Sequence, residues 1–380
     1  MRQDSTAIRH CSTAARFAAV KNYLFALSLF VFTSCSPAYV FRAGWEEAKI
    51  LLGRKPLDEL IDSSDTAANH KEKFRLVNDA RKFSETLGLK PNNSFTQYSH
   101  IDRDVLVWVV SASPKTTFEP VTWWFPIVGR VPYKGFFEKE DAIAEVKKLH
   151  SKGYDVYLRP SAAFSTLGWF DDPLLSTVLK FDEVSLVNTV IHEIVHNTVW
   201  VKDNVHFNET LANFLANVST EQFFGTRDDK YRAFQSAAEN QSHDDLLFAS
   251  YLSALRLELE ALYAKNLPVG DEIADPKVLS TSDILSEREL IFKKARPTWE
   301  SLKARFKGPN YKNLPLPENN AAIIAYWIYL KDINLFADLY RATNYSVPKF
   351  LKEIKLIQEI SRQERRDSYL VMQEQLKGEG

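Results

Sequence analysis

The chain has 380 residues, enough for one large domain or two lobes with an ample hydrophobic core. Hydrophobic residues make up 45% and charged residues 26%, an ordinary globular composition that excludes a disordered chain or a membrane bundle. The formal net charge is -1, so no basic excess points to nucleic acid as a partner. The 12 glycines form no phosphate-binding motif, which disfavours a nucleotide-binding fold.

The N-terminal segment is typical of an export signal. Basic residues precede an apolar run at 23–32, which is too short to span a bilayer. The run ends in FTSC at 32–35, a pattern that resembles the lipobox of bacterial lipoproteins. We therefore expect residues 1–34 to be removed and Cys35 to carry a lipid anchor. A plain signal peptide and a short buried helix are the alternatives.

The cysteines and the residue after the lipobox bear on location. Cys11 lies in the segment to be removed, so the mature chain keeps only Cys35 and has no internal disulfide. Ser36 follows it, where an aspartate would favour retention in the inner membrane of Gram-negative bacteria. We expect an exported protein anchored by lipid at the periplasmic face of the outer membrane.

The mature chain begins with helical patterns and then changes period. Apolar residues at three- and four-residue spacing predict helices between 39 and 87, the last of them over 69–87. Runs rich in β-branched and aromatic residues at 105–113 and 118–125 predict strands. A helix over 138–150 and a short strand at 154–158 are expected next.

The rest of the chain is predicted to be helical. Successive helices are expected over 184–264, and single helices over 286–306, 319–340 and 347–375. The layout predicts a mostly helical α+β fold, with a small early β-sheet and a zincin-like helical region. We expect a single domain over 35–380, with an α/β lobe at 35–180 and a helical lobe at 181–380.

Residues 188–200, NTVIHEIVHNTVW, carry the strongest chemical signal. His192 and His196 are four residues apart, so on an α-helix both rings lie on one face and can share a metal ion. Glu193 is rotated by about 100° from His192 and can reach a bound water. This is the HExxH signature of zinc hydrolases, and the alternative is a structural histidine pair on a core helix.

Tetrahedral zinc needs a third protein ligand, with water in the fourth position. Glu209 follows His196 after twelve residues, where a helical pattern resumes. Two antiparallel helices joined by a turn would bring Glu209 to the histidine pair, with Asn213 one turn further as its hydrogen-bond partner. His206 is the alternative third ligand, less favoured because it lies at the turn.

HExxH followed by N-E-x-x-A resembles the gluzincin metallopeptidases, in which that glutamate is the third zinc ligand. More closely, the chain resembles the "putative aminopeptidase" lipoproteins of Gram-negative bacteria. This resemblance covers nearly all of the mature chain and rests on the HExxH helix and on residues 128–142, 153–175, 207–214 and 319–329. It implies a zinc-dependent peptidase with one zinc ion. The implied ligands are His192, His196 and Glu209, and the implied general base is Glu193.

The tetrahedral intermediate of peptide hydrolysis needs a hydrogen-bond donor beside the zinc, and in gluzincins a tyrosine often supplies it. Tyr329 is the first candidate. Tyr133, Tyr326 and Arg130 are the alternatives, and each tyrosine can also be interpreted as a buried structural residue.

The sequence therefore favours a lipid-anchored zinc peptidase, an aminopeptidase by its resemblance, that acts on peptide substrates. Two alternatives stay open: a zinc amidase acting on a non-peptide envelope substrate, and a non-catalytic envelope lipoprotein with a structural metal. Glu193 favours catalysis because a structural site needs ligands but no base. The choice between exopeptidase and endopeptidase, the oligomeric state and the physiological substrate stay open.

Overall fold

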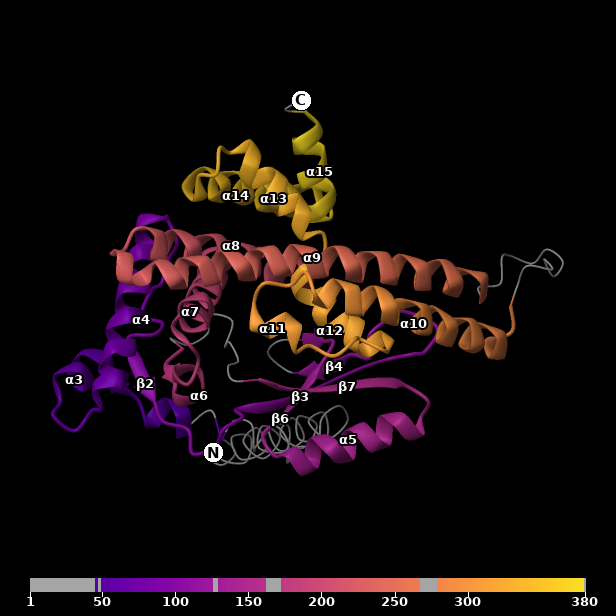
Figure 1. Cartoon of the computed structure of the whole chain (residues 1–380), viewed down its shortest axis with the longest axis horizontal. Coiled ribbons are helices and arrows are strands. Elements are labelled where there is room, and N and C mark those ends of the chain that lie inside the picture. Colours follow the sequence, from indigo (N-terminus) through magenta and orange to yellow (C-terminus); the bar gives the residue numbers. More distant parts are fainter. Residues whose placement is uncertain (1–44, 47–48, 126–128, 162–171, 267–278, 379–380) are drawn as a thin grey trace, which may run out of the picture. The chain divides into compact units, whose positions relative to one another are not determined.

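The computed structural model describes residues 45–46, 49–125, 129–161, 172–266 and 279–378 (Figure 1). The predicted signal segment and Cys35 lie outside the described residues. The described part is mostly helical, with small sheets of two and three strands, which confirms the predicted α+β class. Within it, no helix combines the length and apolar character needed to cross a membrane.

The chain divides into two compact units, one formed by Met1–Leu52 and Thr122–Val131 and the other by Gly53–Val121 and Pro132–Gly380. In the first unit, strands β4 (Trp123–Phe125) and β5 (Gly129–Val131) form an antiparallel pair. The strand predicted from residue 118 begins later because Pro120 cannot donate a ladder hydrogen bond. The predicted lobe boundary at residue 180 stays a prediction.

The second unit contains a three-stranded sheet in the order β6-β3-β7. Strands β6 (Lys134–Phe136) and β7 (Asp155–Ser161) both run antiparallel to β3 (Val107–Ser113). Helices α5 (Lys139–Ser151) and α12 (Asn320–Leu330) cover the two faces of the strands (Figure 1). Because both faces are covered, β3 is apolar and buried along almost its whole length. The two strands and the helix predicted in this region are confirmed.

A second small sheet lies among the early helices, with strand order β1-β2-β8. These strands were not predicted, because two or three residues are too few for a period to show. The helix predicted over 69–87 is confirmed as α4. The elements of this region are β1 (Lys55–Pro56), α3 (Leu57–Asp62), α4 (Ala68–Thr86), β2 (Gln97–Ser99), β8 (Leu174–Leu175) and α6 (Ser176–Leu179).

Helix α8 (Val205–Gly225) is the centre of the helical part. It packs on α7 (Glu183–Thr198), α9 (Arg232–Tyr263) and α12, and it is buried on most of its surface. Figure 1 shows α8 and α9 side by side, with α7 meeting them near one end. The remaining elements here are η1 (Asp229–Tyr231), η2 (Ala264–Asn266), α10 (Thr281–Lys303) and α11 (Pro309–Lys312).

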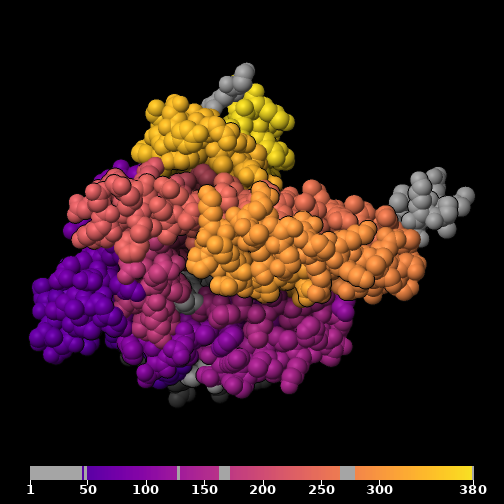
Figure 2. Space-filling view, viewed as in Figure 1, coloured from indigo at the N-terminus to yellow at the C-terminus, as the bar shows by residue number. Residues whose placement is uncertain are grey.

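The last three helices are α13 (Ile333–Ala342), α14 (Val347–Glu364) and α15 (Ser368–Gly378), and they pack together beside α8 and α9 (Figure 2). The single helices predicted over 319–340 and 347–375 are wrong. The first is broken at Asp332 and the second at Arg365, with φ of 51° and 55°. Neither residue is a glycine, so the sequence carries no signal for these left-handed positions.

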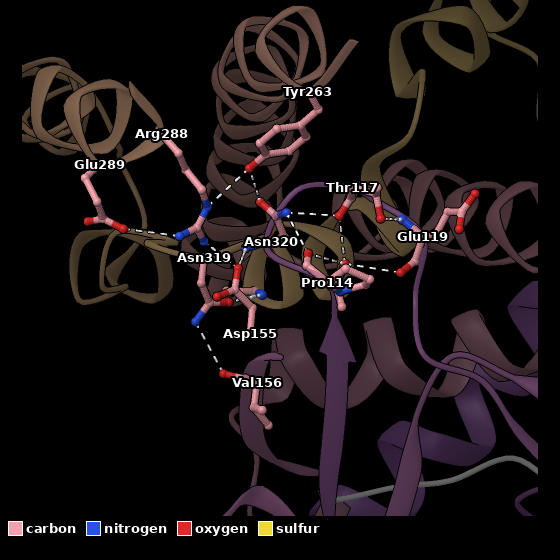
Figure 3. A network of polar contacts seen from close by, with 12 residues as sticks. Pro114, Thr117, Glu119, Asp155, Val156, Tyr263, Arg288, Glu289, Asn319 and Asn320 are labelled. Carbon is pink, nitrogen blue, oxygen red and sulfur yellow. Dashed lines mark hydrogen bonds and ion pairs between the residues drawn. The ribbon is translucent and has the colours of Figure 1, made fainter. Parts of the chain in front are cut away.

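A buried polar network fixes the start of α12 (Figure 3). Asp155 of β7 pairs with Arg288 of α10, and their side chains are only 7% and 4% exposed. The Asp155 carboxylate also accepts the backbone N–H of Asn320 at 2.9 Å. The Asn320 side chain accepts from the Tyr263 hydroxyl at 2.8 Å and donates to the Thr117 carbonyl at 3.0 Å. One buried ion pair therefore joins β7, α9, α10 and α12.

We predict that Arg288→Met lowers the free energy of unfolding by about 3–5 kcal/mol at neutral pH, because Asp155 is left buried without its cation. Burial already raises the pKa of Asp155, against the opposing charge of Arg288. Without Arg288 the folded state binds the Asp155 proton still more tightly than the unfolded state. Stability is then lost as pH rises, so the deficit is smaller at acid pH. Urea unfolding of wild type and Arg288→Met at neutral and at acid pH measures this loss of stability.

The matched control is Arg296→Met, since Arg296 pairs with Glu318 but is 63% exposed. Its unfolding should change little at either pH. A small, pH-independent loss in Arg288→Met would show that Asp155 does not depend on its partner.

Candidate metal centre

Helix α7 presents the HExxH residues from a well-anchored position. Its N-cap, Asp182, accepts a hydrogen bond from the Ser185 N–H at 2.9 Å, which satisfies a free donor of the first turn. The apolar side of the helix is fully buried and includes Val187, Val190, Ile191, Ile194 and Val195. Burial of this face fixes the rotation of the helix, and with it the direction of both histidines.

A short turn reverses the chain between α7 and α8. Asn204 caps α8 by accepting from the Phe207 N–H at 3.2 Å. Asn208 closes the turn, since its side chain accepts from the Val201 N–H at 2.8 Å and donates to the Val201 carbonyl at 2.7 Å. Asp203 adopts a left-handed conformation with φ of 60°. These contacts hold the first turns of α8 against the end of α7, which sets Glu209 toward the histidines.

His192, His196 and Glu209 come together as a cluster. Glu209 Oε2 lies 3.3 Å from His192 Nε2 and 3.6 Å from His196 Nε2. Each residue offers one ligand atom, and the three atoms lie within 4.8 Å of one another. Ligand atoms of a tetrahedral zinc ion lie about 3.3 Å apart, given bonds of about 2.0–2.1 Å. The residues therefore fit a single zinc ion of the predicted kind.

The electrostatics of the cluster also suit a cation. Burial raises the pKa of Glu209, but the charge of His196 and hydrogen bonds with both imidazoles outweigh burial and hold this pKa far below its usual range. Burial lowers the pKa of His196, but the carboxylates of Glu209 and Glu193 outweigh it and raise this pKa. The cluster is thus arranged around positive charge, which protons or a metal ion can supply.

Glu193 lies beside this cluster, and one of its carboxylate oxygens makes no described hydrogen bond. Its Oε2 atom is buried and has no hydrogen-bond partner in the described part of the chain. Desolvating a carboxylate oxygen without a donor is costly, so such an atom calls for a ligand or a water molecule. His192 and Glu209 each keep 15% of their side-chain surface exposed, which leaves the cluster open on one side.

The structure separates the four candidates for the transition-state donor. Tyr329 on α12 pairs with His192, with 6.3 Å between the ring centroids. Tyr133 interacts electrostatically with both Tyr329 and Glu209. The Tyr326 hydroxyl is occupied by a 2.6 Å hydrogen bond with Tyr157.

Arg130 belongs to the first unit, where it donates to the Thr122 hydroxyl at 3.4 Å. It is exposed on β5, and this contact stays within its own unit. Tyr329, by its ring pair with His192, and Tyr133, by its electrostatic interaction with Glu209, are the two candidates with a described interaction to the cluster.

One prediction needs correction, and the less favoured alternative for the third ligand is set aside. Asn213 does not stand behind Glu209 as expected, since its side chain donates to Asp245 at 2.9 Å and to the Tyr329 carbonyl at 3.4 Å. His206 is not part of the ligand cluster. It lines a separate cavity of about 290 Å³, where burial, with a smaller contribution from nearby cations, lowers its pKa to about 4.

Two residues that make contacts at the site were not predicted from the sequence. In the sequence, Asn208 is recognised only as part of the N-E-x-x-A pattern, which does not indicate that it closes the turn. Arg159 on β7 lies against Tyr329, with its Nη2 donating to the tyrosine hydroxyl at 3.5 Å. The alternation of the strand places Arg159 and Tyr157 on one face, but which element that face meets is a tertiary fact.

Fold and site together define a mostly helical α+β protein with an HExxH helix and a His-His-Glu cluster suited to one metal ion. A family model described as "Putative aminopeptidase" matches residues 38–369. The chain belongs to this family, as the resemblance of its motifs predicted, and the family supports a peptidase-like function. Neither the curated proteins nor the solved structures contain a match to the chain.

We predict that the metal-free cluster stabilises the fold only within a pH window. The Glu209 contribution is present above its ordinary pKa of 4.5 and is lost as pH falls through its lowered folded value. The His196 contribution is present below its ordinary pKa of 6.5 and is lost as pH rises through its raised folded value. With a chelator present to remove metal ions, Glu209→Gln should therefore lower the free energy of unfolding by about 1.5–3 kcal/mol near pH 5.5 and by less near pH 8.5.

Urea unfolding of wild type and Glu209→Gln at the two pH values checks this window. The control is Glu258→Gln, an exposed residue of α9, which should behave as wild type at both. A cost that grows toward pH 8.5 would contradict the ion pair.

Proposed function

We propose that this protein is a zinc-dependent peptidase, with His192, His196 and Glu209 as the zinc ligands and Glu193 as the general base. The observation that carries the proposal is the convergence of three ligand atoms within 4.8 Å on two packed helices. Three protein ligands and an open side are the arrangement of catalytic zinc sites, because water or substrate takes the fourth position. Membership of the "Putative aminopeptidase" family supports the same reaction.

The protein's own residues divide the work of hydrolysis. His192, His196 and Glu209 would hold the zinc ion, which would supply Lewis acidity by lowering the pKa of a bound water toward ~7 and by polarising the scissile carbonyl. Glu193 accepts the proton of the attacking water on its unpartnered carboxylate oxygen and then passes it to the leaving amine. Tyr329 donates its hydroxyl proton in a hydrogen bond to the developing oxyanion, and Tyr133 is the alternative donor.

Both tyrosines are suited to donate. Burial raises the pKa of Tyr329 and of Tyr133, and nearby carboxylates add to the shift. Both hydroxyls therefore keep their protons at neutral pH, as a donor to an oxyanion must.

We further propose that the protein works at the periplasmic face of the outer membrane, anchored by lipid at Cys35. The apolar run at 23–32 and the FTSC pattern at 32–35 support export and lipidation. The family name favours an aminopeptidase over an endopeptidase.

Metal content is the first test. Residues 36–380 should bind about one zinc ion per chain, measured by elemental analysis after dialysis. Glu209→Ala should lose the zinc because two histidines alone hold it weakly. Glu258→Ala, an exposed glutamate of α9, is the matched control and should keep it. A wild-type protein without zinc would mean that α7 is an ordinary core helix.

Catalysis is tested with Glu193→Gln, which keeps the shape of the side chain and removes the base. We expect this variant to bind zinc as wild type does and to lose peptide hydrolysis by about 10²–10⁴-fold. The assay uses aminoacyl reporters with a free amine and N-blocked peptides. Hydrolysis of the free-amine reporters alone indicates an aminopeptidase, and hydrolysis of blocked peptides indicates an endopeptidase.

The outcome also separates the alternative functions. Bound zinc with no peptide turnover in wild type would favour a zinc amidase of the envelope or a structural metal site. Full activity in Glu193→Gln would show that another group acts as the base.

A further inference from the structure

Arg159 brings a cation to the metal centre that the proposed mechanism does not use. It stands on β7 and faces α12, as Tyr157 does two residues earlier. Its Nη2 donates to the Tyr329 hydroxyl at 3.5 Å, and its Cζ lies 6.0 Å from the centre of that ring. A guanidinium has five N–H donors, and this long hydrogen bond occupies one of them.

Within the described residues, no carboxylate pairs with Arg159; its polar contact there is the tyrosine hydroxyl. The side chain is partly buried between β7 and α12. Withdrawing a cation from water without an anion is unfavourable, so Arg159 is a strong candidate for a ligand that carries negative charge. By contrast, the buried Arg288 of α10 has its anion in Asp155.

The groups around Arg159 are donors as well. Tyr329 and Tyr133 bring phenol hydroxyls that interact electrostatically with the Arg159 guanidinium. The neighbouring hydroxyls of Tyr157 and Tyr326 are satisfied by one another at 2.6 Å. A guanidinium beside phenol donors matches a carboxylate, which offers two oxygen acceptors in the plane of the guanidinium fork.

The position of Arg159 decides which carboxylate it meets. The Tyr329 ring contacts His192 on one side and Arg159 at its hydroxyl end. Arg159 is therefore removed from the metal ligands by about one side chain. An extended residue spans about 3.3–3.6 Å, so a carboxylate one residue beyond the scissile carbonyl is at a suitable distance.

We propose that Arg159 binds the carboxylate of the substrate residue that follows the scissile bond, so that the protein prefers peptides in which this residue is C-terminal, as it is in a dipeptide. This inference rests on the proposed peptidase function and names its substrate class. An acidic side chain on the same residue offers the same chemistry, and the experiment separates the two sources.

The test is calorimetric binding to the zinc-loaded protein in which Glu193→Gln prevents turnover. The probes are alanyl-phenylalanine and its C-terminal amide, which differ only in the carboxylate. We expect the free dipeptide to bind more tightly than the amide. Adding Arg159→Met should weaken dipeptide binding by about 10–100-fold and leave the amide nearly unchanged. Arg159→Lys should retain part of the preference, because it keeps the charge and loses the fork.

A third probe, the α-amide of alanyl-aspartic acid, moves the carboxylate into the side chain. Weaker binding than the dipeptide supports the C-terminal carboxylate, and tighter binding overturns it. Arg341→Met is the matched control, because Arg341 on α13 is 64% exposed, and it should bind every probe as the parent protein does.

Equal losses for dipeptide and amide in Arg159→Met would overturn the proposal, and so would a parent protein with no preference between them. Zinc content and thermal unfolding are measured for each variant, and Arg159→Lys decides the matter if Arg159→Met does not fold. Failure of the proposed function is read separately, as absence of hydrolysis by the zinc-loaded wild type. The binding comparison needs no turnover and tests Arg159 in either case.

Discussion

Two histidines and a glutamate meet where α7 and α8 pack together, and their charges must balance inside that contact. Glu209 lies 3.3 Å and 3.6 Å from the two imidazoles, so its negative charge calls for a positive one between them. Other contacts of α7 and α8 hold these three residues in position. The apolar face of α7 fixes its rotation, and Asn208 closes the turn that aims α8. Protons on the imidazoles or one metal ion can supply that charge, and a single ion would meet all three ligand atoms at once.

A second buried group of charges lies outside the cluster and holds α12 against β7. Asp155 pairs with Arg288 and accepts the first N–H of α12 from Asn320, which ties this helix to β7 (Figure 3). Tyr329 and Arg159 face each other across the same contact of α12 with β7. The network therefore holds α12, which carries Tyr329, against β7, which carries Arg159, although none of its own residues belongs to the His192, His196 and Glu209 cluster.

The side chains on α7 and α8 differ from those on β7 and α12 in their hydrogen-bonding character. The α7–α8 side carries the metal ligands and the unpartnered carboxylate oxygen of Glu193, all of them acceptors or bases. The β7–α12 side carries tyrosine hydroxyls, which can donate, and a guanidinium, which only donates. Peptide hydrolysis needs this polarity, because the attacking water must lose a proton while the carbonyl oxygen gains negative charge. The family to which the chain belongs supports a peptidase-like function.

The sequence by itself determined what depends on local geometry. The four-residue spacing of His192 and His196 fixes their shared helix face, and the patterns around β3, α4 and α5 fix those elements, because periodicity acts within one segment. The breaks at Asp332 and Arg365 escaped it, since left-handed residues other than glycine leave no pattern. Only the tertiary structure brought Arg159 to Tyr329 and gave Asn213 to Asp245, because the packing of separate elements decides which side chains meet.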